Sequence, residues 1–584
     1  MKNVQDLLYT LQLASPALLL WVAGCLCLLL GNRKQGMLAR LFPHLNQMLA
    51  LIGLGSAGMF IVHCSCFLGW KVKLLSEFSP DNSLHVTTFG AFASLIAIII
   101  GILLVLIGWD PEKRKDNAGA VPLSLSGEYF SMLLFSMSGL LLLAVSNNLI
   151  MLFLAVELVS VPTYIMVTLS RPQGQAREAG LKYFFLGAMA AGILVYGLSL
   201  LYGLSGSILL SAPWGTDAVS IGVMMLREPN AYYLVALLLI VLGLCFKIAA
   251  LPLHFYVADV YQGAASSVTA LLAFLPKLAG FLALMLVIQT IGFPLWEQLS
   301  SETAATVGAV TGWMIWILAA ATMTVGNVLA LLQKNVKRLL AYSSVAHTGY
   351  MMVALLNGTS KFATEGMNAI LFYIAVYGVA TLGAFGILAL IEREGDEAQK
   401  LDDLKGLARR HPGLAAGMAI CIFSLIGMPL TAGFIGKFYV FSSLVNATAV
   451  PHRIILLVIA LVNAAAAAYY YLSILKACYL DDGEFTAQVR SEGTRPQATG
   501  IILASVLTLL LGVMPAILVN PLNGSGRVKQ NASHAQSPPD CPNASDCIQP
   551  APTVRERAKN ADKEIDTQVK EADNNTSALV SRDK

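Results

Sequence analysis

The chain has 584 residues, of which 57% are hydrophobic and only 12% are charged, and its formal net charge is +4. A soluble domain carries about a quarter charged residues, so this composition excludes a chain that faces water on all sides. The small net charge gives no reason to expect a nucleic-acid partner.

Apolar runs of about 20 residues recur along the chain, and a helix of that length crosses a hydrocarbon core of about 30 Å. A lipid-facing backbone must satisfy its hydrogen bonds internally, and these runs lack the alternation of barrel strands. We therefore predict an all-α polytopic membrane protein with about fourteen helices. The predicted spans are 14–30, 46–69, 86–109, 128–146, 149–170, 178–204, 233–257, 265–290, 309–331, 336–356, 365–391, 414–442, 453–480 and 498–521.

The Lys and Arg residues outside the spans indicate how the chain crosses the membrane. With the N-terminus placed outside, eighteen of them fall in inner loops and six in outer loops and the N-terminal segment. Cytoplasmic loops carry the excess of positive charge. We therefore predict that both termini lie on the outer side.

The last part of the chain, residues 523–584, is polar and has a proline-rich patch but no apolar face. This composition predicts a largely disordered tail on the outer side. Cys541 and Cys547 lie in this tail. A disulfide between them and two free thiols are both compatible with the sequence.

A few ionisable side chains remain at membrane depth once the residues of loops and of the tail are set aside. Each costs about 2.5–3.5 kcal/mol at the bilayer centre, so a functional role is favoured over structural ion pairs, which are the alternative. One of them, Lys182, is only about a turn into its helix and could instead extend to the interface. The five residues are Glu157, Lys182, Lys247, Lys277 and Lys437.

Buried lysines suit proton transfer. Burial disfavours the charged form of lysine, whereas a nearby carboxylate favours it, so a lysine whose partner can move is a switchable proton carrier. Glu157 is the carboxylate at that depth, and we expect Lys247 to be its partner.

Two of the lysines lie beside helix breakers. Leu251-Pro252 follows Lys247, and Gly427-Met428-Pro429 precedes Lys437. Proline inside a span frees a carbonyl group, which is tolerated where the backbone is buried or lines a wet cavity. Simple proline kinks are the alternative, but a pair of broken helices is the usual sign of an ion site in a transporter.

Two histidines are candidate relays because imidazole titrates near neutral pH. His254 stands seven residues after Lys247 and would share its face on a continuous helix. His347 lies in the tenth predicted span. Either one could instead be a packing residue. The sequence has no cysteine cluster, dinucleotide-binding glycine motif or paired histidines for haem, so we expect no cofactor on this chain.

Several motifs resemble one known family, the antiporter-like subunits of respiratory complex I. The stretch GLCFKIAALPLHFYVADVYQGAASSVTALLAFLPKLAGF (243–281) is similar to their seventh and eighth helices. QKNVKRLLAYSSVAHTGY (333–350), GMPLTAGFIGKFYV (427–440) and LFLAVELVSVPTY (152–164) resemble further signatures of the family. The resemblance covers about residues 125–480.

Within that family the chain looks most like the branch called subunit N. Its twelfth helix carries Lys437, where the subunit M branch has glutamate, and the tail does not resemble the long lateral helix of subunit L. The polar tail departs from the short C-terminus of subunit N, and the resemblance implies no role for it.

The resemblance implies two inverted five-helix repeats, helices 4–8 and 9–13, with discontinuous helices 7 and 12. It implies that Glu157 and Lys247 form the input pair, which Lys182 modulates, while Lys277 is the central relay and Lys437 the terminal proton site. The implied regions are an N-terminal three-helix region (1–124), the first repeat (125–290), the second repeat (305–480), a C-terminal helix (498–522) and the tail (523–584).

The resemblance also implies a function. The chain would be a membrane-arm subunit of NADH-quinone oxidoreductase in the bacterial inner membrane, with periplasmic termini, and would translocate protons. NADH, FMN, iron–sulfur clusters and quinone would belong to partner subunits, among them subunits M, K and J. The alternatives are a subunit of a sodium/proton antiporter or membrane-bound hydrogenase, and a scaffold that has lost transport.

Overall fold

The computed structural model divides into two compact units, and all described residues lie in the first, Met1–Arg527. The predicted tail at 523–584 lies outside the described residues, and so do its two cysteines. The described residues are 10–31, 44–69, 77–78, 83–109, 127–171, 174–211, 220–222, 224, 232–288, 290, 302–356, 363–393, 396–397, 399–446, 451–481, 488–489 and 495–519.

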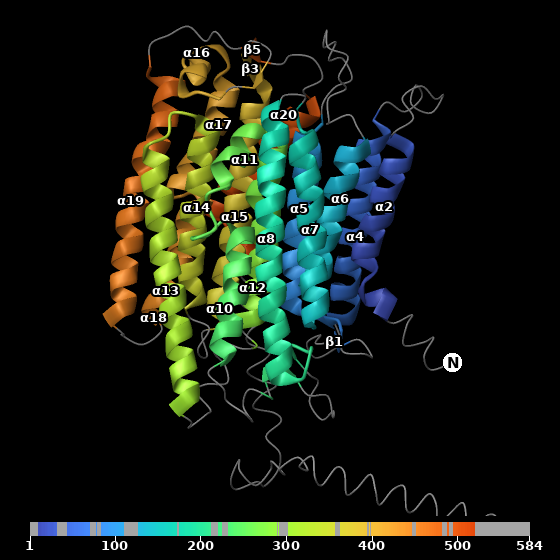
Figure 1. The fold of residues 1–584 in the computed structure, drawn as a ribbon. Coiled ribbons are helices and arrows are strands. Elements are labelled where there is room, and N and C mark those ends of the chain that lie inside the picture. The colour runs from blue at the N-terminus through green and yellow to red at the C-terminus, as the bar shows by residue number, and fades with distance from the viewer. Residues whose placement is uncertain are drawn as a thin grey trace, which may run out of the picture. The chain divides into compact units, whose positions relative to one another are not determined.

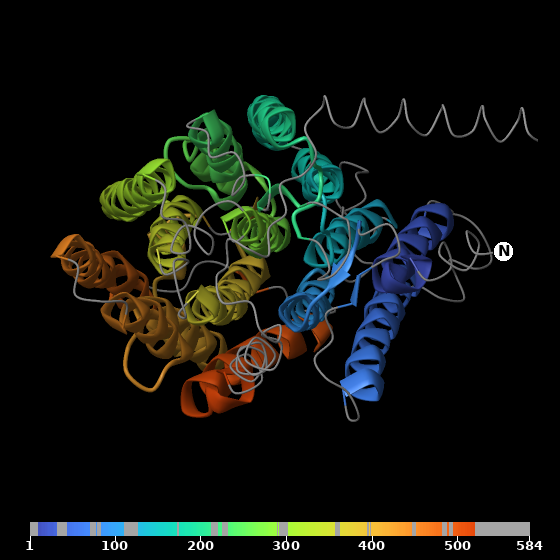
Figure 2. The same cartoon turned by 90° about the horizontal axis from the view of Figure 1, so that it is seen from below.

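The long helices of this unit run side by side (Figure 1), and Figure 2 shows them nearly end on. The first half contains α2 (Ser15–Gly31), α4 (Leu45–Gly69), α5 (Thr88–Ile107), α6 (Gly127–Ala144), α7 (Leu149–Leu169), α8 (Gly174–Ser205), α10 (Tyr232–Ile248), α11 (Val257–Gly263) and α12 (Ser266–Val287). The second half contains α13 (Glu302–Leu331), α14 (Val336–Leu355), α15 (Ala363–Leu390), α16 (Leu407–Arg410), α17 (Pro412–Ile426), α18 (Ala432–Asn446), α19 (Pro451–Tyr479) and α20 (Arg495–Val513).

Short strands lie at the two ends of the bundle, where helices connect (Figure 1). Strand β1 (Glu77–Phe78) pairs antiparallel with β2 (His85–Val86). At the opposite end a three-stranded sheet has the order β4-β3-β5, and both of its pairings are antiparallel. Its strands are β3 (Ile391–Arg393), β4 (Asp396–Glu397) and β5 (Gln488–Val489), and the 3-10 helix η3 (Leu401–Leu404) follows β4.

Ten helices of the described part are long and apolar enough to cross a membrane, judged by length and composition. This result confirms the predicted all-α polytopic class. Helices α2, α10, α17 and α18 are apolar but shorter, and α14 begins with the charged pair Lys337 and Arg338. The total of about fourteen crossings therefore stays a prediction.

Helix α15 lies at the centre of the bundle. An 18-residue stretch of it is completely buried, whereas only about a third of the corresponding stretches of α8 and α19 is buried. It packs against α5, α12, α14, α17, α18 and α20. Because α12 carries Lys277 and α18 carries Lys437, α15 connects the surroundings of these two lysines.

Candidate proton-transfer site

The seventh predicted span is broken next to its buried lysine, as the sequence predicts. Helix α10 ends at Ile248, one residue after Lys247, and α11 begins at Val257. The residues between them, 249–256, form no helix. Ala249 has a φ of 60°, a left-handed conformation that costs a non-glycine residue about 1–3 kcal/mol and clusters at functional sites.

Side chains satisfy the carbonyl groups that this break frees. Thr348 on α14 donates its hydroxyl to the carbonyl of Ile248 at 2.7 Å, and Tyr256 donates to the carbonyl of Phe246 at 2.7 Å. The opened backbone is therefore supported from inside the bundle, as a break at membrane depth requires.

The twelfth predicted span is also broken. Helix α17 ends at Ile426 and α18 begins at Ala432. Gly427 ends α17 with a φ of 85°, and Leu430 has a φ of 71°. Both breaks thus combine a buried lysine nearby with a left-handed residue that is not glycine.

Lys247 is buried and bound by three side chains of α7. Its ammonium group donates to Glu157 Oε1 at 2.9 Å, to Ser160 Oγ at 2.8 Å and to Tyr164 Oη at 3.3 Å. An ammonium group has three donors, so every N–H is matched. The expected Glu157–Lys247 contact is confirmed.

The two hydroxyl partners of Lys247 were not predicted, although the sequence held a signal for them. Ser160 and Tyr164 follow Glu157 by three and seven residues. That spacing places all three side chains on one face of a helix.

Lys277 on α12 is held without a carboxylate among the described residues. It donates to the main-chain carbonyl of Ser344 on α14. Its ammonium nitrogen lies 4.9 Å from the ring centroid of Tyr377 on α15. Main-chain oxygen and an aromatic face are weaker partners for a cation than a carboxylate, so the ammonium charge of Lys277 is less well compensated than that of Lys247.

Lys437 on α18 is held by the broken backbone itself. It donates to the carbonyls of Ile426 at 2.7 Å and Leu425 at 3.2 Å. These carbonyls belong to the last turn of α17 and have no partner further along that helix. The ring of Tyr350 lies 5.3 Å away. The break therefore creates the binding site for the lysine.

The two candidate histidines differ. His347 is buried between hydroxyls, with Nδ1 2.7 Å from Tyr373 Oη and Nε2 2.9 Å from Tyr471 Oη. His254 lies in the break, because α10 ends at Ile248 and the chain is not helical between Lys247 and His254, so the continuous helix that would place both on one face is not formed.

Lys182 lies on the exposed face of α8. Its ion-pair partners are Glu178 at 2.8 Å and Asp259 at 3.3 Å rather than Glu157. Asp259 belongs to α11 and also receives Arg338 at 2.7 Å. We missed Asp259 in the sequence because it lies just beyond the predicted span 233–257.

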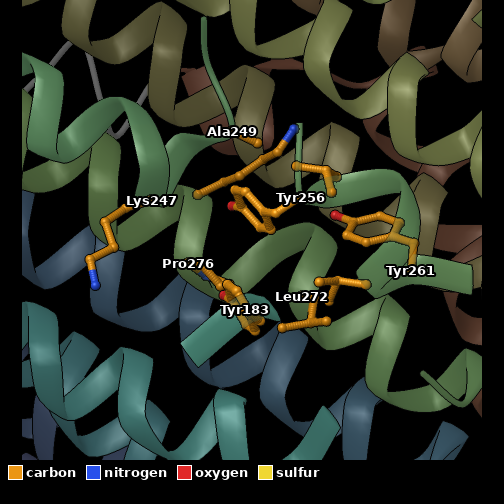
Figure 3. Close-up of a pocket in the computed structure, with 10 residues that line it drawn as sticks. Tyr183, Lys247, Ala249, Tyr256, Tyr261, Leu272 and Pro276 are labelled. Atoms are coloured by element: carbon orange, nitrogen blue, oxygen red, sulfur yellow. The ribbon is translucent and has the colours of Figure 1, made fainter. Parts of the chain in front are cut away.

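A small cavity lies between Lys247 and Lys277. Its volume is about 10 Å³, close to the least space that holds one water molecule. Figure 3 shows Lys247 at one side, with its amine turned away from Tyr256 and Tyr261. The wall also includes Tyr183, Val257, Val260, Leu272 and Pro276.

A second buried charge cluster lies at the end of the bundle, beside β3 and β4. Glu397 Oε2 accepts from Arg171 at 2.5 Å and from Lys337 at 2.6 Å. It also accepts from the amide nitrogen of Ser266 at 2.8 Å and from its hydroxyl at 2.6 Å. One carboxylate thus joins the end of α7, the start of α12 and the start of α14.

Glu397 remains ionised in this cluster. Burial raises its pKa, but Lys337 and Arg171, together with the hydrogen bonds from Lys337 and Ser266, outweigh burial and hold the pKa well below its usual range. The cluster was missed because each member falls in a charged loop or at a helix end, where charged residues are common.

The chain matches one family model and several known proteins. Residues 146–463 match the family described as NADH:quinone oxidoreductase/Mrp antiporter, transmembrane. NADH-quinone oxidoreductase subunit N of Trichlorobacter lovleyi is 34% identical over 525 residues, covering 88% of this chain and 97% of the relative.

Solved structures agree with this match. A chain of respiratory complex I from Thermus thermophilus with bound aureothin superposes with a TM-score of 0.65 at 31% identity, covering 87% of this chain and 99% of that one. A chain of the Mrp complex from Dietzia sp. DQ12-45-1b has a TM-score of 0.68 at 18% identity, covering 88% and 96%. The second likeness shows the fold alone.

The fold and the site define a polytopic membrane protein whose described residues include two broken helices and four buried lysines, Lys247, Lys277, Lys337 and Lys437. The chain belongs to the family of NADH-quinone oxidoreductase subunit N, within the NADH:quinone oxidoreductase/Mrp antiporter membrane proteins.

Replacing Glu397 tests the charge cluster. Glu397→Gln leaves Lys337 and Arg171 buried without a counter-charge, so we expect a loss of about 3 kcal/mol of stability at pH 7. The pKa of Glu397 is lowered in the folded chain, so its contribution is complete above the unfolded pKa of about 4.3 and is lost as the pH falls through the folded pKa. Thermal unfolding in detergent from pH 7 downward measures both effects.

Asp402→Asn is the matched control for this prediction. It removes an exposed carboxylate that pairs with Lys405 at 2.7 Å and should leave the unfolding midpoint unchanged. Equal midpoints for the two variants at pH 7 would refute the structural role of Glu397.

Proposed function

We propose that this chain is a membrane-arm subunit of NADH-quinone oxidoreductase that moves protons across the membrane while other subunits pass electrons from NADH to quinone. The observation that carries this proposal is Lys247, a buried ammonium bound by Glu157 next to a broken helix. The 34% identity to subunit N favours this function over that of a cation/proton antiporter. The likeness to the Mrp complex, at 18% identity, extends only to the fold.

The Glu157–Lys247 pair is the proposed input. While the carboxylate is in place, the ammonium form of Lys247 is favoured because its charge is compensated at 2.9 Å. If Glu157 moves away, the ammonium stays buried without its counter-charge, and the neutral form is favoured instead. The proton is then released toward the cavity and Lys277.

The remaining residues complete the proposed path. Lys277 receives the proton next, His347 relays it, and Lys437 holds it last before the output. Lys182 acts on the input pair through Asp259, which lies on α11 beyond the break. His254 remains a proposed relay on the input side.

The proposed architecture follows the family. Two inverted repeats, 125–290 and 305–480, would each contain one broken helix, and both contain a lysine and a left-handed residue near the break. The N-terminal region 1–124 and the helix at 498–522 would flank them. Fourteen crossings of the bacterial inner membrane would place both termini and the tail in the periplasm.

The proposed partners are other membrane-arm subunits, among them subunits M, K and J. NADH, FMN, the iron–sulfur clusters and quinone would belong to partner chains. Purification of the tagged chain in mild detergent should therefore recover NADH-oxidising activity with an artificial electron acceptor. Recovery of an assembly without that activity would favour the antiporter.

Replacing Lys247 tests the input. Lys247→Ala removes the buried proton carrier, so we expect NADH-driven proton translocation in membrane vesicles to be lost. Electron transfer from NADH to a small artificial acceptor should continue, because that reaction does not need this chain. Lys405→Ala, in a lysine exposed outside the predicted spans, is the control and should translocate normally. An unchanged ratio of protons to electrons in Lys247→Ala would overturn the proposal.

Filling the cavity tests the step between Lys247 and Lys277. Leu272→Phe adds side-chain volume at the cavity wall, so it should exclude water and slow proton translocation. Leu282→Phe adds the same volume elsewhere on α12, at a residue equally buried, and controls for overpacking. If the two variants translocate protons at equal rates, the cavity is not part of the path.

A further inference from the structure

The proposed path has a gap between Lys277 and His347. No hydrogen bond joins these two side chains in the part of the chain that the structure describes. Lys277 donates to a main-chain carbonyl of α14, and both nitrogens of His347 lie on tyrosine hydroxyls. A proton on Lys277 therefore needs a further group to reach the imidazole.

Tyr377 on the central helix α15 lies between these two side chains. Its ring centroid is 4.9 Å from the ammonium nitrogen of Lys277 and 5.0 Å from the ring centroid of His347. The residue is 3% exposed. The ring of Tyr377 is thus within contact range of both Lys277 and His347.

The hydroxyl of Tyr377 is buried and has no well-formed hydrogen bond with a described residue. Its polar neighbour is the side chain of Ser344, the residue whose carbonyl accepts from Lys277. A buried hydroxyl without a partner costs about 1–3 kcal/mol, and such a group in a folded protein requires an explanation. Phenylalanine would provide the same ring to Lys277 without this cost. Packing alone therefore does not explain why this position has a hydroxyl group.

A second tyrosine of α15 also contacts the imidazole of His347. Tyr373 precedes Tyr377 by four residues, so both lie on one face of α15. Its hydroxyl is 2.7 Å from His347 Nδ1. Its ring packs against α18 at Gly436, where an added Cβ would come within 2.6 Å of the ring. Gly436 directly precedes Lys437, so α15 leads from Lys277 toward the last lysine.

We propose that Tyr377 is a relay residue that passes the proton from Lys277 to His347. The proton leaves the Lys277 ammonium for the Tyr377 oxygen through a bridging water, as the hydroxyl's own proton leaves toward the Tyr373 hydroxyl. The Tyr373 hydroxyl in turn donates its proton to His347 Nδ1. Lys277 ends neutral, His347 ends protonated and Tyr377 is a neutral hydroxyl before and after. The hydroxyl then rotates to accept the next proton.

This inference rests on the proposed function and adds a residue that neither the motifs nor the lysine pattern indicates. The decisive variant is Tyr377→Phe, which removes one oxygen and keeps the ring beside Lys277. We expect NADH-driven proton translocation to slow about tenfold. Loss of an acid–base group usually lowers a rate by about 10²–10⁴, but here water can occupy part of the vacated space, so a smaller effect is expected. The solvent deuterium isotope effect on translocation should rise as the transfer becomes rate-limiting.

Tyr233→Phe is the matched control. Tyr233 is 2% exposed on α10, and its hydroxyl donates to the carbonyl of Leu204. This variant should keep the wild-type rate and isotope effect. Because the Tyr377 hydroxyl has no well-formed hydrogen bond to lose, Tyr377→Phe should also assemble and unfold like the wild type. Failure of Tyr377→Phe to assemble would show a structural hydroxyl and would overturn the relay.

Lys277→Ala in the same membranes separates the two proposals. If Lys277→Ala stops translocation while Tyr377→Phe leaves rate and isotope effect unchanged, the relay is wrong and the proposed function stands. If Lys277→Ala itself translocates normally, the proposed function fails at this lysine. Loss of translocation in Lys277→Ala, together with a slowed rate and a raised isotope effect in Tyr377→Phe, supports the relay.

Discussion

A charged ammonium group inside a membrane bundle is stable only where other oxygens replace the water that it has lost. The structure supplies these oxygens in two ways. Lys247 receives a carboxylate and two hydroxyls from one face of α7. Lys437 receives two main-chain carbonyls at the end of α17. The partner of Lys247 is the side chain of Glu157, which can rotate, whereas the partners of Lys437 are main-chain carbonyls held by α17. The two lysines therefore suit different stages of transport.

The broken helices follow from the same requirement. An intact helix uses its carbonyls internally and has none to offer a cation, so the ligands of Lys437 exist only because α17 ends at Ile426. The left-handed residues Ala249 and Leu430 add strain of about 1–3 kcal/mol each. Neighbouring helices offset such costs, as Thr348 does by donating to the first break.

Helix α14 links the ends of the bundle to its centre. Its first turn provides Lys337 to the Glu397 cluster, and two turns later the carbonyl of Ser344 accepts from Lys277, the buried lysine of α12. The same Glu397 carboxylate also holds the start of α12. The cluster at the end of the bundle and the polar centre therefore share two helices, so the end cluster positions the elements that carry the candidate site.

The sequence by itself determined the helices, the breaks and most of the buried charges, because apolar run length, proline and charge in an apolar run are local properties. It also contained the partners of Lys247 on α7, since Ser160 and Tyr164 follow Glu157 at helical spacing. Only the tertiary structure decided which residues meet across helices. Arg171 and Glu397 are 226 residues apart, and nothing near either one indicates the other. Tyr377 looks like an ordinary aromatic residue of a buried helix, and Lys182 looks like a buried charge until the fold exposes it. Periodicity describes one helix at a time, whereas these contacts depend on how helices pack against one another.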